Sequence, residues 1–147
     1  MLSVLRILLI ILGIAAIAIC LSILFLGPSA TASSSEHLYN AVMGWRERVD
    51  GAWPATMDSE LRFYAPFWGA YGVLLIATAR DLSRLGLWVP WLALLFFAGG
   101  VGRAISWMAA GPPHPFFLLL MAIELVTPPV LALLWWGGRA SSGVGQG

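Results

Sequence analysis

Lysine is absent from the 147-residue sequence, and the eight basic residues are all arginine. Seven acidic residues nearly balance them, so the net charge is +1 and charged residues make up only 10% of the chain. Soluble domains carry about 25% charged residues. A basic nucleic-acid-binding surface needs clustered Lys and Arg, and a disordered chain combines low hydrophobicity with high net charge. The scarcity of charge therefore excludes all three classes.

Residues and motifs of catalytic or metal chemistry are also scarce. Cys20 is the single cysteine, so no internal disulfide can form, and we expect it to be a buried small apolar residue. The sequence has no HExxH, no G-x-S-x-G and no glycine-rich phosphate loop. His37 and His114 lie in separate segments without an obvious third ligand. We therefore predict no catalytic residue, no metal site and no cofactor, and the sequence gives no support to an enzymatic activity.

Long hydrophobic runs are what the sequence has instead. Hydrophobic residues make up 60% of the chain, and the mean hydropathy is +0.87. A membrane-spanning helix needs about 20 apolar residues. Four runs bounded by Gly, Pro or charged residues predict spans over about residues 2–26, 61–79, 87–110 and 116–136. We expect an all-α, four-transmembrane-helix bundle, a single membrane domain over residues 1–147 whose tail, residues 140–147, is disordered.

The first run has a competing interpretation as a cleaved signal peptide. Arg6 precedes it, and Ala30-Thr31-Ala32 resembles a cleavage site. The apolar core of a signal peptide usually has about 7–15 residues, which is shorter than the uncharged stretch from Ile7 to Leu26. A retained span is therefore favoured.

A more polar segment separates the first two predicted spans. Ser33 and Glu36 stand at capping-box spacing, which is typical of a helix start. Apolar residues then recur at helical spacing: Leu38, Val42, Trp45 and Val49. The pattern predicts a short amphipathic helix over about residues 35–50, ended by Gly51. It either packs on the ends of the spans or lies in the membrane interface with its apolar side in lipid.

The charges outside the spans predict the orientation. One side of the bundle holds four arginines and one acid, a net +3, and the other holds two arginines and five acids, a net −3. The arginines of the positive side are Arg6, Arg80, Arg84 and Arg139. Because cytoplasmic loops are enriched in arginine and lysine, we predict that both termini are cytoplasmic. Tryptophans flank the spans at both predicted interfaces, as aromatic belts do.

Three charges remain inside the predicted spans: Arg62, Arg103 and Glu124. Such residues are costly in a bilayer, face the bundle interior and pair with one another. Arg103 lies 8 residues before Gly111, and Glu124 lies 9 residues after Pro115. Both are therefore about 12–14 Å from the turn that joins their helices. We predict an ion pair between Arg103 and Glu124.

Three interpretations of these charges are open. The pair can be a structural clasp that sets the register of two helices. It can also belong to a polar pocket built from Arg62, Arg103, Ser106, His114 and Glu124. Two arginines there would suit a carboxylate or a phosphate headgroup. A proton or ion path is the third interpretation, and it would depend on a single buried acid.

Several short motifs between residues 58 and 136 point to one family. They are Glu60-Leu61-Arg62-Phe63-Tyr64, Gly102-Arg103 with Ser106, Gly111-Pro112 through Pro115, Glu124-Leu125 and Pro128-Pro129. In these motifs the sequence resembles a family of small bacterial four-helix membrane proteins known only as a domain of unknown function. The resemblance implies four spans in a bacterial inner membrane and a polar set of Arg62, Arg103 and Glu124, but no activity, cofactor or substrate. The segment between the first two spans is expected to depart from the family.

Two functions fit these expectations. The first is a non-catalytic accessory or scaffold subunit of a membrane complex, with other membrane subunits as partners. The second is a binder or carrier of a lipid or amphiphilic anion, with membrane lipids as partners; nucleic acid is expected in neither case. A scaffold predicts that Arg103 and Glu124 close on each other without a cavity, whereas a binder predicts an opening beside them.

Overall fold

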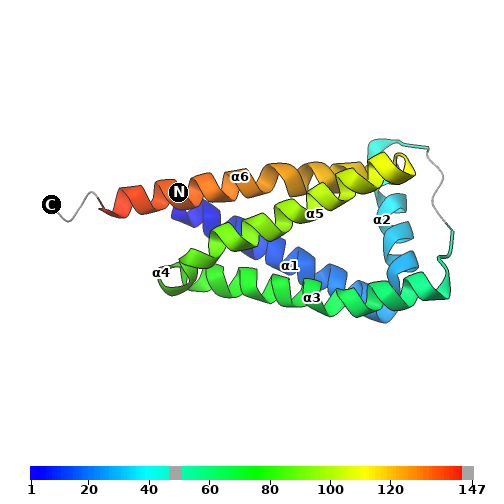
Figure 1. Ribbon diagram of the computed structural model, residues 1–147, viewed down its shortest axis with the longest axis horizontal. Helices are drawn as coiled ribbons and strands as arrows, with labels where there is room; N and C mark the ends of the chain where they lie inside the picture. Colours follow the sequence, from blue (N-terminus) through cyan, green and yellow to red (C-terminus); the bar gives the residue numbers. More distant parts are fainter. Residues whose placement is uncertain (47–50, 144–147) are drawn as a thin grey trace.

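The computed structural model describes residues 1–46 and 51–143, and in these residues the secondary structure is helical, joined by short loops and without a strand. The all-α class predicted from the sequence is confirmed. In chain order the elements are α1 (Leu2–Leu26), α2 (Pro28–Met43), α3 (Ala55–Arg80), α4 (Leu82–Leu85), the 3₁₀ turn η1 (Gly86–Trp88), α5 (Val89–Ala110) and α6 (Pro115–Gly143). The long helices α1, α3, α5 and α6 lie roughly along one axis, with α2 across one end (Figure 1).

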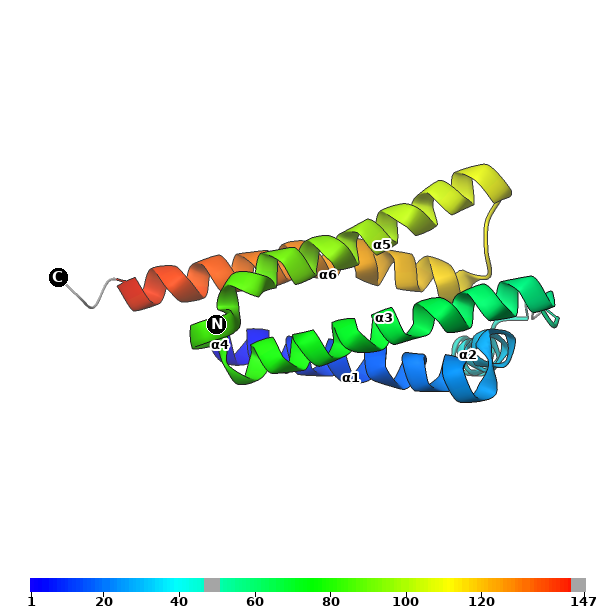
Figure 2. The same ribbon diagram turned by 60° about the horizontal axis from the view of Figure 1, so that its bottom comes forward.

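The long helices pack as two pairs, α1 with α3 and α5 with α6. The pairs lie close together where α3 turns through α4 into α5, and they diverge toward the opposite end (Figure 2). We call these the α4 end and the α2 end. The α4 end also holds the N-terminus, and the α2 end holds the turn between α5 and α6 (Figure 1).

A hydrophobic core joins the two pairs. Its fully buried side chains come from all four long helices and include Leu5, Leu9, Leu75, Leu92 and Leu131. These residues lie in the half of each helix nearest the α4 end. Hydrophobic packing therefore holds the pairs together at the α4 end.

The turn at the α4 end is fixed by Asp81. Its carboxylate accepts hydrogen bonds from the Ser83 hydroxyl at 2.5 Å and from the Arg84 amide at 3.1 Å. These bonds favour the charged form and lower the pKa of Asp81. The side chain thereby caps α4, as aspartate commonly does at a helix start.

Glycines allow α1 and α3 to approach closely. A Cβ atom on Gly13 would lie 2.7 Å from the carbonyl oxygen of Gly72, and a Cβ on Gly72 would lie 2.7 Å from that of Gly13. Further along the same contact, a Cβ on Gly69 would lie 2.7 Å from Cys20 Sγ. Cys20 is buried there, as expected from the sequence. Backbone-to-backbone approach at small residues is a common mode of helix packing in membranes.

The bounds predicted for the helix between the first two spans are wrong. The helix α2 begins at Pro28, directly after Gly27 with φ of 97°, because proline is preorganised for the first helical turn. It ends at Gly44, whose left-handed φ of 66° makes it the C-cap in place of Gly51. The expected residues 47–50, including Val49, lie outside the described part of the chain.

The helix α2 does not pack its predicted apolar face on the spans. Leu38 is 66% exposed and Val42 is 73% exposed, whereas Glu36 is only 1% exposed. The helix thus directs a polar residue inward and apolar residues outward. Its contacts are with α1, α3 and α6, so it bridges the two helix pairs at the α2 end.

The last helix is longer than the sequence predicts. We expected Gly137 and Gly138 to end it and a disordered tail to follow from residue 140, but α6 continues to Gly143. The two glycines lie against Met1 and Leu2 of the chain start. This close packing offsets the low helix propensity of glycine, which costs about 1 kcal/mol per residue relative to alanine.

Within the described residues, three segments are long and apolar enough to cross a membrane: Leu2–Leu26, Leu82–Ala110 and Pro115–Arg139. The helix α3 is not among them. Its first half carries Asp58, Glu60 and Arg62 together with Tyr64 and Pro66, which lower its hydropathy. The count of four spans therefore stays a prediction.

The Gly13–Gly72 contact can be tested with alanine. Gly72→Ala places a methyl group against backbone of α1, so we expect a loss of about 1–3 kcal/mol of stability. Gly102→Ala is the control because no described atom lies within 4 Å of its Cβ position, and alanine is the better helix former. It should be neutral or stabilising. Thermal unfolding in one detergent measures both, and equal stability of the two variants would contradict the close approach.

Candidate functional site

A groove of about 720 Å³ lies between the diverging helix pairs. All four long helices line it, through residues such as Ile23 of α1, Trp68 of α3, Gly102 of α5 and Glu124 of α6. Small-molecule sites typically occupy about 300–1,000 Å³ and are mostly apolar with a few polar groups. This groove has that composition, because Arg103 and Glu124 are its charged lining residues within the part of the chain that the structure describes.

Arg103 and Glu124 form the ion pair that residue counting predicts. Arg103 Nε donates to Glu124 Oε2 at 2.7 Å, across α5 and α6. The Glu124 residue is only 6% exposed. Helices α5 and α6 come close beside it because Gly100 has no side chain; a Cβ there would lie 2.9 Å from Leu125 and 3.0 Å from Glu124 Cβ.

The Arg103 guanidinium also packs against an aromatic ring. Its Cζ lies 5.7 Å from the centroid of Phe117, a cation–π contact. Within the described residues, its terminal amino groups form no hydrogen bond. The side chain is partly exposed, so these amino groups can donate to a bound molecule.

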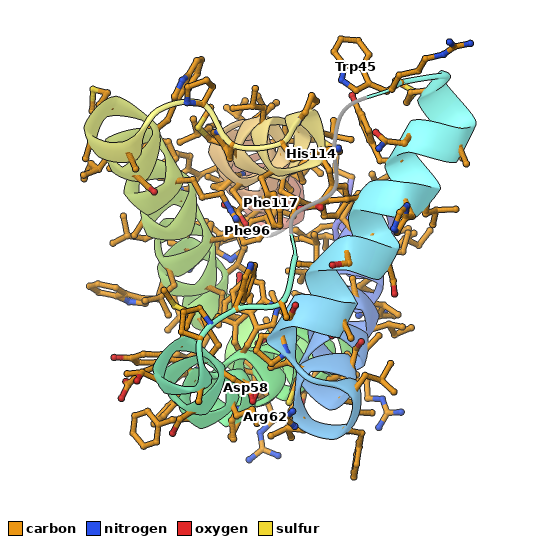
Figure 3. All side chains as sticks on the ribbon, turned by 90° about the vertical axis from the view of Figure 1, so that its right-hand side faces the viewer. Trp45, Asp58, Arg62, Phe96, His114 and Phe117 are labelled. Atoms are coloured by element: carbon orange, nitrogen blue, oxygen red, sulfur yellow. The ribbon has the colours of Figure 1, made fainter. Side chains whose placement is uncertain are left out.

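Arg62 lies away from this pair. Its Nε donates to Asp58 at 2.8 Å, and its Nη1 donates to the Leu24 carbonyl at 2.5 Å. That carbonyl has no helical hydrogen-bond donor, because the residue four positions later is Pro28, which has no N–H. Arg62 therefore stabilises the break between α1 and α2. In the view onto the α2 end, Arg62 and Asp58 lie at the opposite edge from His114 (Figure 3).

His114 ties α2 to the start of α6. Its Nδ1 accepts a hydrogen bond from the Phe116 amide at 3.2 Å, so in the neutral ring Nε2 carries the hydrogen. Nε2 can then donate to Asn40 Oδ1 of α2 at 3.1 Å. The Tyr39 ring packs edge-on against both His114 and Phe116. His114 thus connects the two helix pairs across the α2 end and does not line the groove.

The structure brings together part of the polar set expected from the sequence. Arg103, Ser106 and Glu124 line one groove, whereas Arg62 and His114 are engaged elsewhere.

The aromatic wall of the groove was not anticipated. Tyr64, Phe67, Trp68 and Tyr71 follow one another at the spacing of a single helix face. The spacing was visible in the sequence, but it could not distinguish a groove wall from an ordinary packed or lipid-facing surface.

The fold and groove define an all-helical protein with helices apolar enough to cross a membrane. The chain belongs to the family described as Domain of unknown function (DUF4345), which matches residues 4–136. This confirms the family expected from the sequence motifs. The matched range includes α2, and the expectation that the segment between the first two predicted spans departs from the family stays a prediction. No curated protein and no solved structure matches the chain.

A double-mutant cycle tests the ion pair. Arg103→Gln leaves the buried Glu124 carboxylate without a countercharge, and we expect a loss of about 2 kcal/mol of stability, below the range for fully buried pairs because Arg103 is partly exposed. Adding Glu124→Gln should restore most of that loss. The free energy of unfolding in detergent measures each variant. Additive effects of the two substitutions would show that the side chains are not paired.

The contact between α2 and His114 predicts local stability. Asn40→Ala removes the hydrogen bond to His114, which is worth about 1 kcal/mol, and this corresponds to at least roughly fivefold faster amide exchange through opening of α2. Hydrogen–deuterium exchange of the α2 amides measures the change. Ser34→Ala, at an exposed position of the same helix, is the control and should leave exchange unchanged. Equal exchange in both variants would show that the contact with His114 does not stabilise α2.

Proposed function

We propose that this protein is a multi-pass membrane protein that binds an amphiphilic molecule in the groove between its helix pairs. The observation that carries the proposal is the position of the groove directly beside Arg103 and Glu124. A clasp alone requires no adjoining space. The long apolar wall suits a hydrocarbon tail, and the polar residues at one side suit a polar group.

Four spans and cytoplasmic termini are part of the proposal. The 26 residues of α3 extend about 39 Å, which exceeds the hydrocarbon thickness of about 30 Å, and α3 packs along α1. The arginines Arg6, Arg80, Arg84 and Arg139 lie in the elements of the α4 end. By the positive-inside rule this end faces the cytoplasm, and the groove then lies toward the outer leaflet.

The glycines of α5 support binding rather than simple packing. Gly99 and Gly102 both line the groove. A glycine inside a helix costs about 1 kcal/mol relative to alanine. Elsewhere in this chain glycines admit a neighbouring helix, but a Cβ at Gly102 would meet no described atom within 4 Å. Gly102 would have the corresponding role of admitting a bound molecule that lies against the backbone of α5.

The accessory-subunit role expected from the sequence stays a prediction. Large apolar side chains are exposed along all the long helices, among them Ile14, Phe67, Leu95 and Leu133. Contact with membrane lipid accounts for these surfaces as well as contact with a partner would, so they do not favour a scaffold.

Filling the groove tests the proposal. Native mass spectrometry of the full chain, purified in mild detergent, should detect a co-purified amphiphile. Gly102→Leu should lower its retention by at least about tenfold, because the new side chain occupies the space beside Arg103.

Ala98→Leu is the matched control, since Ala98 is an exposed residue of α5 outside the groove lining. It should retain the amphiphile at the level of the native chain. A native protein that carries no amphiphile, or a Gly102→Leu variant that retains it fully, would contradict the proposed function.

A further inference from the structure

We propose that the polar group bound beside Arg103 is an uncharged hydrogen-bond acceptor, such as an ester, ketone or hydroxyl oxygen, and not a carboxylate or phosphate. This inference rests on the proposed function and specifies its ligand class. It departs from the amphiphilic anion expected from the sequence, because the structure removes one of the two arginines on which that expectation depended.

Arg103 supplies the donors for such a group. Its Nε is engaged with Glu124 Oε2 at 2.7 Å, and its terminal amino groups form no hydrogen bond within the described residues. A guanidinium can donate from Nε and from both terminal amino groups, and it accepts no hydrogen bond. A ligand that completes this site must therefore present an acceptor oxygen to the terminal amino groups.

The charge of the site argues against an anion. Glu124 already neutralises Arg103, and among the described residues these two are the charged ones that line the groove. A carboxylate or phosphate would leave one negative charge without compensation among apolar side chains, where ionised groups are poorly solvated. It would also compete with the buried Glu124 for the same guanidinium.

The second arginine does not change this balance. Arg62 is paired with Asp58, which cancels its charge, and it also donates a hydrogen bond to the Leu24 carbonyl. Neither Arg62 nor Asp58 lines the groove. Among the described lining residues, an anion in the groove would therefore meet no cation other than Arg103.

The wall around Arg103 has room for a compact polar group. Ser106 lies one turn along α5 on the same side and adds a hydroxyl that can donate or accept. Gly102 leaves open space, and a Cβ at Gly99 would lie 3.9 Å from Glu124 Oε2. The apolar remainder of the molecule can then extend along Tyr64 and Trp68 of α3, which line the facing side.

Two lipids that differ in a single group provide the test. Dioleoylglycerol is uncharged, and dioleoyl phosphatidic acid has the same acyl chains with an added phosphate. The full chain, freed of lipid in detergent, is exposed to each, and retention is measured by native mass spectrometry. We expect dioleoylglycerol to be retained at least about tenfold better.

The outcomes separate this inference from the proposed function. Equal or better retention of phosphatidic acid overturns the uncharged ligand class but leaves amphiphile binding in place. The same conclusion holds if neither probe is retained while the purified protein carries an anionic amphiphile that Gly102→Leu displaces. If nothing is retained in any sample, both proposals fail.

A change of site charge gives a second, independent readout. Glu124→Gln leaves Arg103 with an uncompensated positive charge, so the preference should shift toward phosphatidic acid by at least about tenfold. Asp58→Asn is the matched control, because it removes the carboxylate partner of the other arginine outside the groove. It should leave the preference unchanged. An unchanged preference in a folded Glu124→Gln variant overturns the charge argument.

Discussion

The hydrogen-bonded ion pair between Arg103 and Glu124 is the interaction on which the arrangement of α5 and α6 depends. Two opposite charges in an apolar environment must meet, because either one alone is poorly solvated. Their meeting fixes how far one helix is shifted along the other, and Gly100 lets the backbones come close enough for it. The same pair sets the charge of the groove beside it, so a structural contact and the chemistry of the site have one origin.

The groove exists because the long helices form two pairs and not one uniform bundle. Glycine contacts hold α1 against α3, while the core around Leu75, Leu92 and Leu131 joins the pairs only toward the α4 end. Toward the α2 end the pairs diverge, and α2 bridges them through Asn40 and His114. The site is therefore bounded by tight packing at one end and by a single short helix at the other.

Those parts of the fold and site that depend on nearby residues in the sequence could be predicted. The first predicted span, residues 2–26, coincides with α1, and residue counting from a shared turn was enough to pair Arg103 with Glu124. Predictions failed where a distant segment decided the outcome. Arg62 serves a carbonyl freed by Pro28, which lies in a different helix. The helix α6 passes two glycines because the start of the chain packs against them.

The sequence by itself determined that the chain is helical, apolar and poor in charge, because hydrophobic run length and the distribution of arginine are local properties. It also determined which two charges meet within one helical hairpin. Only the tertiary structure decided that Arg62 and His114 lie outside the site and that aromatic residues of α3 form its wall. Those facts depend on contacts between segments far apart in the chain: Arg62 bonds the Leu24 carbonyl, His114 contacts Asn40, and the wall forms where α3 faces α5 and α6.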